Sequence, residues 1–165
     1  MTIRGRVWKF GDDVNTDVIM PGKYLAMRDP VEIAPYIMEG IDPEFGKKAK
    51  PGDIIVAGKN FGCGSSRETA PAGLKAFGIG AILAPTFARI FLRNAVNIGL
   101  PVLECPAAAN DIREWDVVAV EMATGRIIDE TTGRTYQAAP FPPFLQELIA
   151  AGGLVNYARR RLGSA

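Results

Sequence analysis

The residues of this sequence that are best suited to chemistry lie in one glycine-rich stretch, Gly62-Cys63-Gly64-Ser65-Ser66-Arg67-Glu68. Its glycines let another molecule approach the backbone closely. Ser65 and Glu68 have the spacing of a capping box, which predicts a helix with Ser65 as its N-cap. A helix N-terminus attracts anions, and the Arg67 guanidinium offers a forked donor to a carboxylate. The stretch therefore predicts a carboxylate-binding loop, although a capped helix beside a solvated arginine explains the same spacing equally well.

Other kinds of site fit this loop less well. A P-loop needs a lysine before its Ser or Thr, and a glycine stands before Ser65. A dinucleotide-binding G-x-G-x-x-G needs a third glycine where Arg67 stands. Cys63 precedes the predicted helix, which would lower its pKa, but the chain has no histidine to activate a thiol. We therefore interpret Cys63 as a small, partly buried packing residue.

The elements on either side of the loop predict how it is held. An apolar run at residues 53–57 has the length of a buried strand, and a helical pattern after the loop stops at Gly78. A second apolar run, residues 79–84, follows directly. This order of strand, loop, helix and strand is a βαβ unit. It places the loop at the carboxyl end of a strand, where open α/β sheets bind ligands.

The remaining patterns predict a single α/β domain, residues 1–165, in which helices flank a mixed central sheet. Further strands are expected at Ile3–Phe10, Leu100–Leu103, Asp116–Glu121 and Arg126–Asp129, the last two joined by a turn at Thr124-Gly125. Helices are expected at Val31–Glu39, at Phe87–Asn97 with Thr86 as N-cap, at Phe144–Ala151 and at Leu154–Leu162. The sequence has no internal repeat and no low-complexity linker.

Composition excludes several classes of protein. At 165 residues, with 48% apolar and 22% charged residues, the chain is typical of a soluble globular domain. Its net charge of +1 gives no reason to expect binding to nucleic acid or to an anionic membrane. Neither a secretory signal nor an apolar run of membrane-spanning length is visible, so we expect a cytoplasmic protein. Two cysteines and no histidine cannot ligate an iron–sulfur cluster or a closed zinc site alone.

A second polar stretch, Asn15-Thr16-Asp17, is also a candidate for chemistry. By composition it is a loop stabilised by local hydrogen bonds of its Asn, Thr and Asp side chains. Residues 22–30 predict another loop, closed by Asp29-Pro30. Arg28 in this loop is explained equally well as an exposed side chain and as part of a binding site.

Several motifs together resemble the swivel domain of the aconitase superfamily. They are the loop Gly62–Glu68, the stretch Ala84-Pro85-Thr86-Phe87-Ala88-Arg89-Ile90-Phe91 with Arg93-Asn94 after it, and the ending Ala151–Tyr157. Their order and separation, and the length of the chain, are similar to the separate small subunits of the 3-isopropylmalate dehydratase and homoaconitase type. The resemblance extends from about Arg6 to Tyr157, which is nearly the whole chain.

The resemblance implies an aconitase swivel-type fold and a hydro-lyase of the 3-isopropylmalate dehydratase type, which isomerises 2- and 3-isopropylmalate by dehydration and rehydration in leucine biosynthesis. Such a small subunit is active only with a large subunit, with a heterotetramer as one expected assembly. The large subunit carries the [4Fe-4S] cluster, and we expect this chain to bind no cofactor. For Arg89 and Asn94 we expect support of the loop or of the subunit contact rather than a catalytic role.

The resemblance also assigns roles to residues of the two polar stretches. Ser65 is implied as the base that exchanges the proton, and Asp17 as a member of the acid–base network that faces the cluster. Ser66 and Arg67 are implied as ligands of a carboxylate on a small hydroxy-acid substrate. A serine alkoxide needs nearby positive charge and N–H donors, which we expect from Arg67 and the predicted helix start.

The substrate depends on the loop at residues 22–30. Relatives carry Tyr-Leu-Arg-x on a loop that selects the substrate side chain, and this chain has Tyr24-Leu25-Ala26-Met27 instead. Met27 favours an alkyl tail, whereas Arg28 favours an additional carboxylate. We predict isopropylmalate dehydratase, with homoaconitase or a related enzyme such as dimethylmalate dehydratase as the alternative. A non-catalytic carboxylate-binding module and a structural interaction protein remain open as other classes of function.

Overall fold

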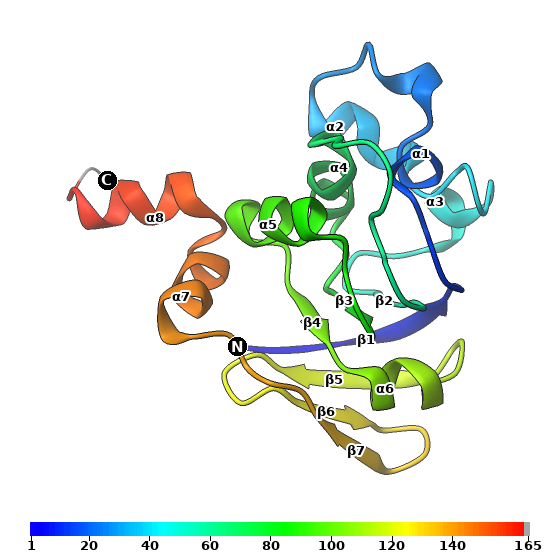
Figure 1. The fold of residues 1–165 in the computed structure, drawn as a ribbon, viewed down its shortest axis with the longest axis vertical. Helices are drawn as coiled ribbons and strands as arrows, with labels where there is room; N and C mark the ends of the chain where they lie inside the picture. The colour runs from blue at the N-terminus through cyan, green and yellow to red at the C-terminus, as the bar shows by residue number, and fades with distance from the viewer. Residues whose placement is uncertain (164–165) are drawn as a thin grey trace.

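The computed structural model describes residues 1–163, and its strands form one mixed seven-stranded sheet (Figure 1). The strand order is β4-β3-β2-β1-β5-β6-β7. The strands are β1 (Thr2–Lys9), β2 (Ile54–Val56), β3 (Ala81–Ala84), β4 (Val102–Glu104), β5 (Val117–Glu121), β6 (Arg126–Asp129) and β7 (Arg134–Gln137). The mixed sheet predicted from the sequence is confirmed, and the strands expected from its apolar patterns are all present.

The sheet has a parallel half and an antiparallel half. β1 pairs in parallel with β2, β2 with β3, and β3 with β4. β2 and β3 are buried along their whole length, which explains why both are short, uninterrupted apolar runs in the sequence. On the other side, β1 pairs antiparallel with β5, which continues into β6 and β7. The turn between β5 and β6 lies where it was expected, with Gly125 at a φ of 77°.

Helices fill the connections between the strands. They are α1 (Thr16–Ile19), α2 (Pro30–Ile33), α3 (Phe45–Lys48), α4 (Thr69–Phe77), α5 (Arg89–Ile98), α6 (Pro106–Asp111), α7 (Pro143–Ala151) and α8 (Leu154–Arg161), with 3₁₀ turns η1 (Gly22–Tyr24) and η2 (Ala34–Tyr36). α4 joins β2 to β3 and α5 joins β3 to β4, so the predicted βαβ unit is present and is followed by a second one. No helix within residues 1–163 has the length and apolar character needed to cross a membrane.

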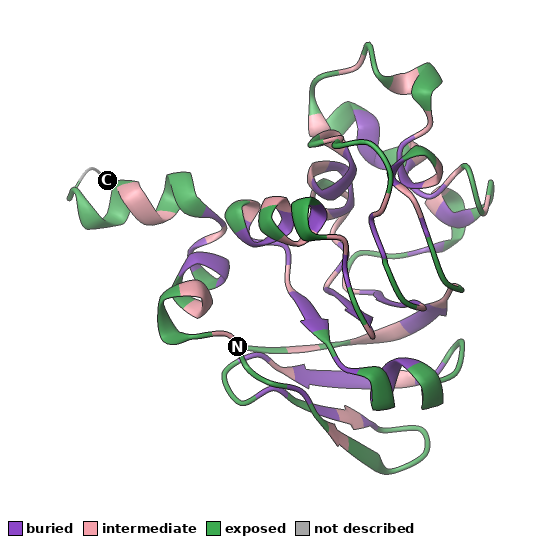
Figure 2. Ribbon diagram, in the orientation of Figure 1, coloured by how far each residue is buried: buried purple, intermediate pink, exposed green. Residues whose placement is uncertain are grey.

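The buried faces of α4 and α5 lie towards the core, and α7 packs against α5 (Figure 2). One ammonium group fixes this arrangement. Lys75 of α4 donates to the carbonyl of Ile98 at the end of α5 and, at 2.7 Å, to that of Gly152 at the end of α7. Burial lowers the pKa of Lys75. α8 is largely exposed and extends away from the sheet (Figures 1 and 2).

Two helices differ from those that the sequence predicts. The helix expected over Val31–Glu39 is wrong: the chain forms α2 and then the 3₁₀ turn η2. Pro35 has no N–H to continue the α-helical hydrogen bonds, so the regular helix ends at Ile33.

The predicted N-cap at Thr86 is also wrong, because α5 begins at Arg89 and its N-cap is Ala88. The Thr86 hydroxyl instead accepts a hydrogen bond from the Asn60 N–H at 2.8 Å. Thr86 therefore stabilises the segment just before the glycine-rich loop, and the helix starts at Arg89, two residues later than the local sequence predicts.

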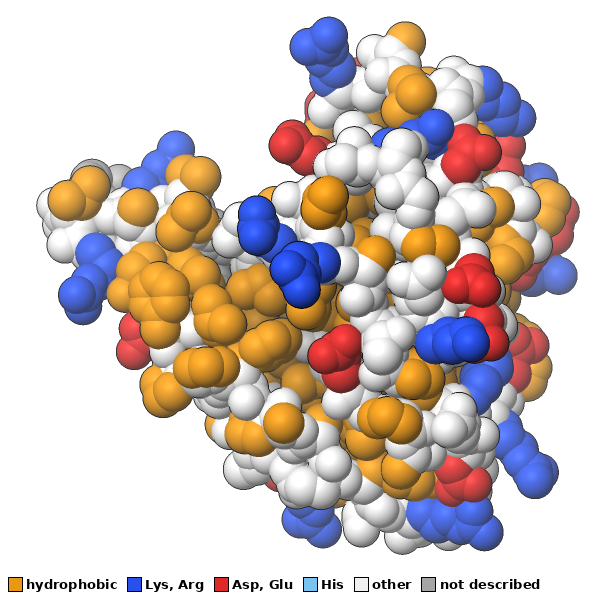
Figure 3. Space-filling view, viewed as in Figure 1, with side chains coloured by type: hydrophobic (Ala, Val, Ile, Leu, Met, Phe, Trp, Pro, Cys, Tyr) orange, Lys and Arg blue, Asp and Glu red, His pale blue; other side chains and the backbone are white. Residues whose placement is uncertain are grey.

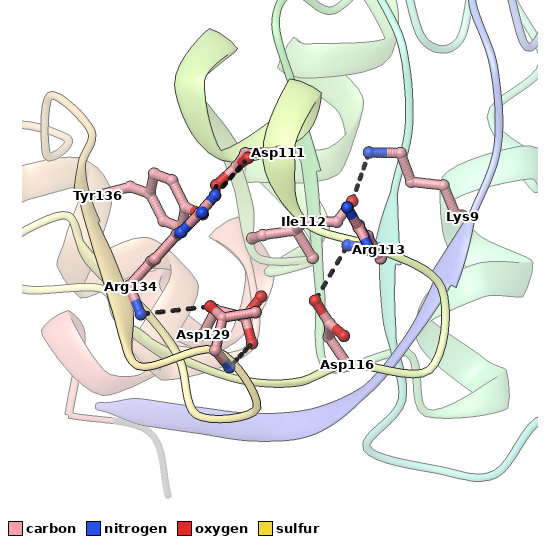
Figure 4. A network of polar contacts seen from close by, with 9 residues as sticks. Lys9, Asp111, Ile112, Arg113, Asp116, Asp129, Arg134 and Tyr136 are labelled. Atoms are coloured by element: carbon pink, nitrogen blue, oxygen red, sulfur yellow. Dashed lines mark hydrogen bonds and ion pairs between the residues drawn. The ribbon is translucent and has the colours of Figure 1, made fainter.

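A polar network joins the antiparallel half of the sheet to α6 (Figure 4). Arg134 of β7 donates twice to the Asp111 carboxylate, each time at 2.9 Å, and Tyr136 donates to the same carboxylate. Burial and the hydrogen bond to Asp111 raise the pKa of Tyr136 to about 12. Burial, followed by the neighbouring Asp116, raises the pKa of Asp129. These residues brace the sheet, and none of them lines the cavities of the candidate site described below.

Candidate active site

Two loops that are far apart in the sequence lie side by side beyond the carboxyl ends of β1 and β2. The Gly62 N–H donates to the Val14 carbonyl at 2.7 Å, and the Thr16 N–H donates to the Cys63 carbonyl at 2.9 Å. The Thr16 hydroxyl also donates to the Ser65 carbonyl at 2.7 Å. The two polar stretches that the sequence presents separately therefore form one surface.

The capping box predicted at Ser65 is wrong. α4 begins at Thr69, and its N-cap Glu68 makes no side-chain hydrogen bond to the helix. In a helix capped by Ser65, the Ser65 carbonyl would accept the first intrahelical hydrogen bond; here it accepts the Thr16 hydroxyl of the neighbouring loop. Ser65 and Ser66 therefore lie in irregular loop backbone, where both are exposed.

Arg67 links the two loops through its side chain. Its Nη1 donates to Asp17 Oδ1 at 2.8 Å and to the Met20 carbonyl at 2.7 Å. The Arg67 side chain is only 18% exposed, whereas that of Asp17 is 67% exposed. A single nitrogen thus holds the guanidinium in place, and within residues 1–163 neither its Nε nor its Nη2 has a hydrogen-bond partner. These remaining donors are the ones that can bind an incoming carboxylate.

Two cavities meet at the segment Ser65–Arg67. One, of about 210 Å³, lies between this segment and the start of α5, where it is lined by Arg89 and Asn94. The other is wider and more open, about 690 Å³, and lies between the same segment and the side chains of Met27 and Arg28. The structure thus gathers the residues predicted for the site around one loop, with Asp17 joined to it through Arg67.

α5 lies at the candidate site itself. Arg89 and Asn94 line the smaller cavity together with Ser65, so they lie beside the candidate reacting group rather than only behind the loop. Arg89 is the first residue of α5, where a helix has N–H groups without intrahelical partners. The positive helix start that was expected at Ser65 is therefore supplied by α5. No local pattern predicts this, because the contact depends on where the crossover between β3 and β4 places the helix.

The smaller cavity is positively charged. Arg67 and Arg89 line it, and no Asp or Glu of the described chain does. The neighbouring Cys63 is not an activated thiol, because burial raises its pKa and the Asp13 carboxylate raises it further. The interpretation of Cys63 as a partly buried packing residue agrees with its half-buried position.

Gly62 lets the loop pack directly against α5. Its φ is +83°, and a Cβ on it would lie 2.2 Å from Cγ of Phe91. We expect Gly62→Ala to lower the free energy of unfolding by about 3 kcal/mol or more, because it adds steric overlap in the core to backbone strain. Gly133→Ala is the matched control, since Gly133 has a φ of +78° but open space where a Cβ would lie. Urea unfolding should show a loss of only about 1 kcal/mol for the control, and equal losses would contradict the packing argument.

Comparison with known proteins shows which family has this loop and this fold. The Aconitase C-terminal domain family matches residues 18–108. The 3-isopropylmalate dehydratase small subunit of Thermodesulfovibrio yellowstonii is 54% identical over 162 residues, which are 98% of this chain and 96% of that protein. The small subunit of the same name from Aliarcobacter butzleri is 55% identical over 164 residues, 99% and 98% of the two chains. This chain belongs to the 3-isopropylmalate dehydratase small-subunit family.

The solved structure of a member of this small-subunit family has the same fold. The crystal structure of 3-isopropylmalate dehydratase from Methanocaldococcus jannaschii matches with a TM-score of 0.92 at 47% identity, covering 98% of this chain and 96% of that one. A 50% identical relative from the same organism is named isopropylmalate/citramalate isomerase small subunit, and the match covers 99% of this chain and 97% of that protein. The resemblance and the swivel-type fold inferred from the sequence are thus confirmed.

Hydro-lyases of the aconitase family use an iron–sulfur cluster, and the described residues of this chain do not provide a ligand set that fits one. Within residues 1–163, no three His, Cys, Asp or Glu side chains come together in a way that could hold a metal ion. Cys63 lies in the glycine-rich loop and Cys105 is buried just before α6, and both are free. A cluster needs thiolate ligands that converge on it, and these two do not supply such a set.

Proposed function

We propose that this chain, together with a large subunit, interconverts 2- and 3-isopropylmalate by dehydration and rehydration in leucine biosynthesis, as a cytoplasmic enzyme. The names of its relatives support this activity. The position of Ser65, Ser66 and Arg67 is the observation that supports a role for particular residues. These three residues line both the smaller, positively charged cavity and the wider cavity, which Met27 and Arg28 also line. We propose that the whole chain acts as one swivel-type domain in that complex.

The chemistry divides between the two subunits. Dehydration removes a proton next to a carboxylate while a hydroxide leaves, and the departure of hydroxide calls for a Lewis acid. We assign the cluster that supplies this Lewis acid to the large subunit, because the described residues of this chain offer no ligand set for it. The contribution of this chain is then to bind and orient the substrate and to move the proton.

We propose that Ser65 exchanges the proton. Its side chain lies in an exposed loop segment, and the cavity beside it is lined by two arginines, Arg67 and Arg89. Positive charge and free helix N–H groups stabilise an alkoxide, which serine otherwise forms only with difficulty. No Asp or Glu of the described residues lines this cavity, so no carboxylate there opposes the formation of the alkoxide.

Ser66, Arg67 and Asp17 complete the proposed site. The free Nε and Nη2 of Arg67 form a fork that matches a substrate carboxylate, and the Ser66 hydroxyl adds a further donor. Asp17 holds Arg67 at 2.8 Å and, being mostly exposed, is accessible to the acid–base network on the side of the large subunit. In this proposal the ion pair between Asp17 and Arg67 therefore links substrate binding to proton transfer.

We place the large subunit over the start of α5. A groove of about 280 Å³ is lined by apolar residues of α5 and α7, by Phe141 just before α7, and by Arg89 and Arg93, and it shares Arg89 with the smaller cavity. Figure 3 shows this apolar surface beside basic side chains, between α8 and the body of the molecule. Because Arg89 lines both the groove and the cavity, a subunit that brings a cluster close to Ser65 would cover both.

The proposed substrate preference can be tested by substitution of Met27. Met27 packs partly against the core, and it lines the wide cavity, so it can form an apolar wall for an isopropyl group. The wild-type complex is expected to prefer isopropylmalate over homoaconitate in kcat/KM, and Met27→Arg should shift that ratio towards the tricarboxylate by about tenfold. Val31→Arg is the matched control, because Val31 is 71% exposed and lines neither cavity.

The alternative substrate class rests on Arg28. This side chain is exposed and lines the same cavity, so it is the cation that a homoaconitate-type substrate would use. A wild-type complex that preferred homoaconitate, and lost this preference in Arg28→Ala, would reverse the assignment. Because one relative is named isopropylmalate/citramalate isomerase, citramalate belongs in the same substrate panel.

A further inference from the structure

The loop that carries Met27 and Arg28 has little regular structure of its own. Between α1 and α2 the chain forms only the 3₁₀ turn η1, and Leu25 is 47% exposed. Short exposed loops of this kind move easily unless side chains hold them. The side chains that face the wide cavity can therefore have a defined position only if the base of the loop is fixed.

A side-chain clamp fixes that base. The Tyr24 hydroxyl donates to the carboxylate of Glu39, at 2.7 and 2.8 Å to its two oxygens. Lys23 Nζ forms an ion pair with the same carboxylate at 2.9 Å. The Tyr24 ring stacks on that of Tyr36, with centroids 4.4 Å apart and planes 13° from parallel. Two consecutive residues of the loop are thus attached to one carboxylate.

Glu39 is itself held rigidly by its neighbours. The Met38 N–H donates to the Ile19 carbonyl at 2.8 Å, and the Gly40 N–H donates to the Val18 carbonyl at 3.1 Å. Met38 is fully buried, and a Cβ on Gly40 would lie 2.6 Å from Cα of Val18. The backbone on both sides of Glu39 is therefore pinned to α1, so the carboxylate is presented to the loop from a fixed position.

We infer that Glu39 is a positioning residue for substrate selection: it holds Tyr24 and Lys23 so that Met27 and Arg28 face the Ser65–Arg67 segment. This inference rests on the proposed function, because it concerns the selectivity of the same cavity. Glu39 does not line that cavity and acts only through the loop. Its hydrogen bonds with Tyr24 are partly buried, and the Lys23 partner of its ion pair is 66% exposed. Ion pairs near the surface contribute little to global stability, so the loss of these contacts should appear in the loop and in selectivity more than in the melting temperature.

The test compares Glu39→Ala with Glu32→Ala, a matched control whose carboxylate is exposed on α2. In the two-subunit complex, Glu39→Ala should lower the preference for isopropylmalate over the smaller citramalate by about fivefold, because the apolar wall is no longer held in place. Glu39→Gln should recover part of that preference, since its carbonyl still accepts the Tyr24 hydroxyl. Tyr24→Phe added to Glu39→Ala should change the preference little further, because both remove the same contact.

A second readout does not need activity. Trypsin cleavage after Arg28 in the full-length chain should become about tenfold faster in Glu39→Ala, while the melting temperature stays unchanged. Arg28 has no contact with Glu39, so its cleavage reports the mobility of the loop rather than the loss of a local ion pair. Cleavage and selectivity equal to those of Glu32→Ala would overturn the inference, as would faster cleavage with unchanged selectivity. A wild-type complex without isopropylmalate turnover would instead overturn the proposed function, and the cleavage assay would still show whether the clamp exists.

Discussion

Ser65→Ala is expected to lower kcat of the two-subunit enzyme by about a hundredfold to ten-thousandfold, which is the contribution usual for a positioned acid–base group. KM should change little, because Arg67 and Ser66 still line both cavities and still bind the substrate. The Ser65 carbonyl, which accepts the Thr16 hydroxyl at 2.7 Å, is unaffected by the substitution, so the loop should keep its conformation. Steady-state kinetics of the reconstituted complex measure both constants.

Ser66→Ala is the matched control in the same loop. It removes a hydroxyl from the neighbouring exposed position, and we expect it to raise KM more than it lowers kcat, since the proposed role of Ser66 is to bind a carboxylate. Both variants should assemble with the large subunit as the wild type does. If Ser65→Ala retained near-normal kcat, the loop would be a structural feature and the proton would have to leave by another group.

Arg67→Lys is expected to raise KM by about ten- to a hundredfold even though the charge is conserved. In the structure one nitrogen of Arg67 is already used by Asp17 and the Met20 carbonyl, and the others remain for the substrate. A lysine ammonium cannot keep both of these contacts and also offer a two-pronged donor, because its three N–H groups share one nitrogen. Kinetics of the variant complex, with tight substrate analogues as a check on binding, measure the effect.

Arg126→Lys is the control for a simple exchange of cations. Arg126 is exposed on β6 and forms no ion pair within the described chain, so its exchange should leave KM unchanged. Asp17→Asn should reproduce part of the Arg67→Lys effect, because it removes the charge that holds the guanidinium. A normal KM in Arg67→Lys would show that the substrate carboxylate binds elsewhere.

The sequence alone determined the elements that bury apolar surface. β2 and β3 are recognisable because strands covered on both faces consist of uninterrupted apolar residues. α7 and α8 follow from glycine and proline boundaries, and Gly125 marks the turn of the β5–β6 hairpin. The glycine-rich loop and the motifs after it also resemble one family, and the comparisons confirm that resemblance.

The tertiary structure alone decided how the site is assembled. A capping box at Ser65 is locally favourable, yet the Ser65 carbonyl accepts the Thr16 hydroxyl from the neighbouring loop, and α4 begins at Thr69. In the same way the Thr86 hydroxyl accepts the Asn60 N–H, α5 begins at Arg89, and the first turn of α5 lines the cavity that Ser65 also lines. Both outcomes depend on hydrogen bonds between residues 26 or more positions apart. Local sequence patterns do not identify such distant partners, because a side chain forms whichever hydrogen bond the fold brings within its reach.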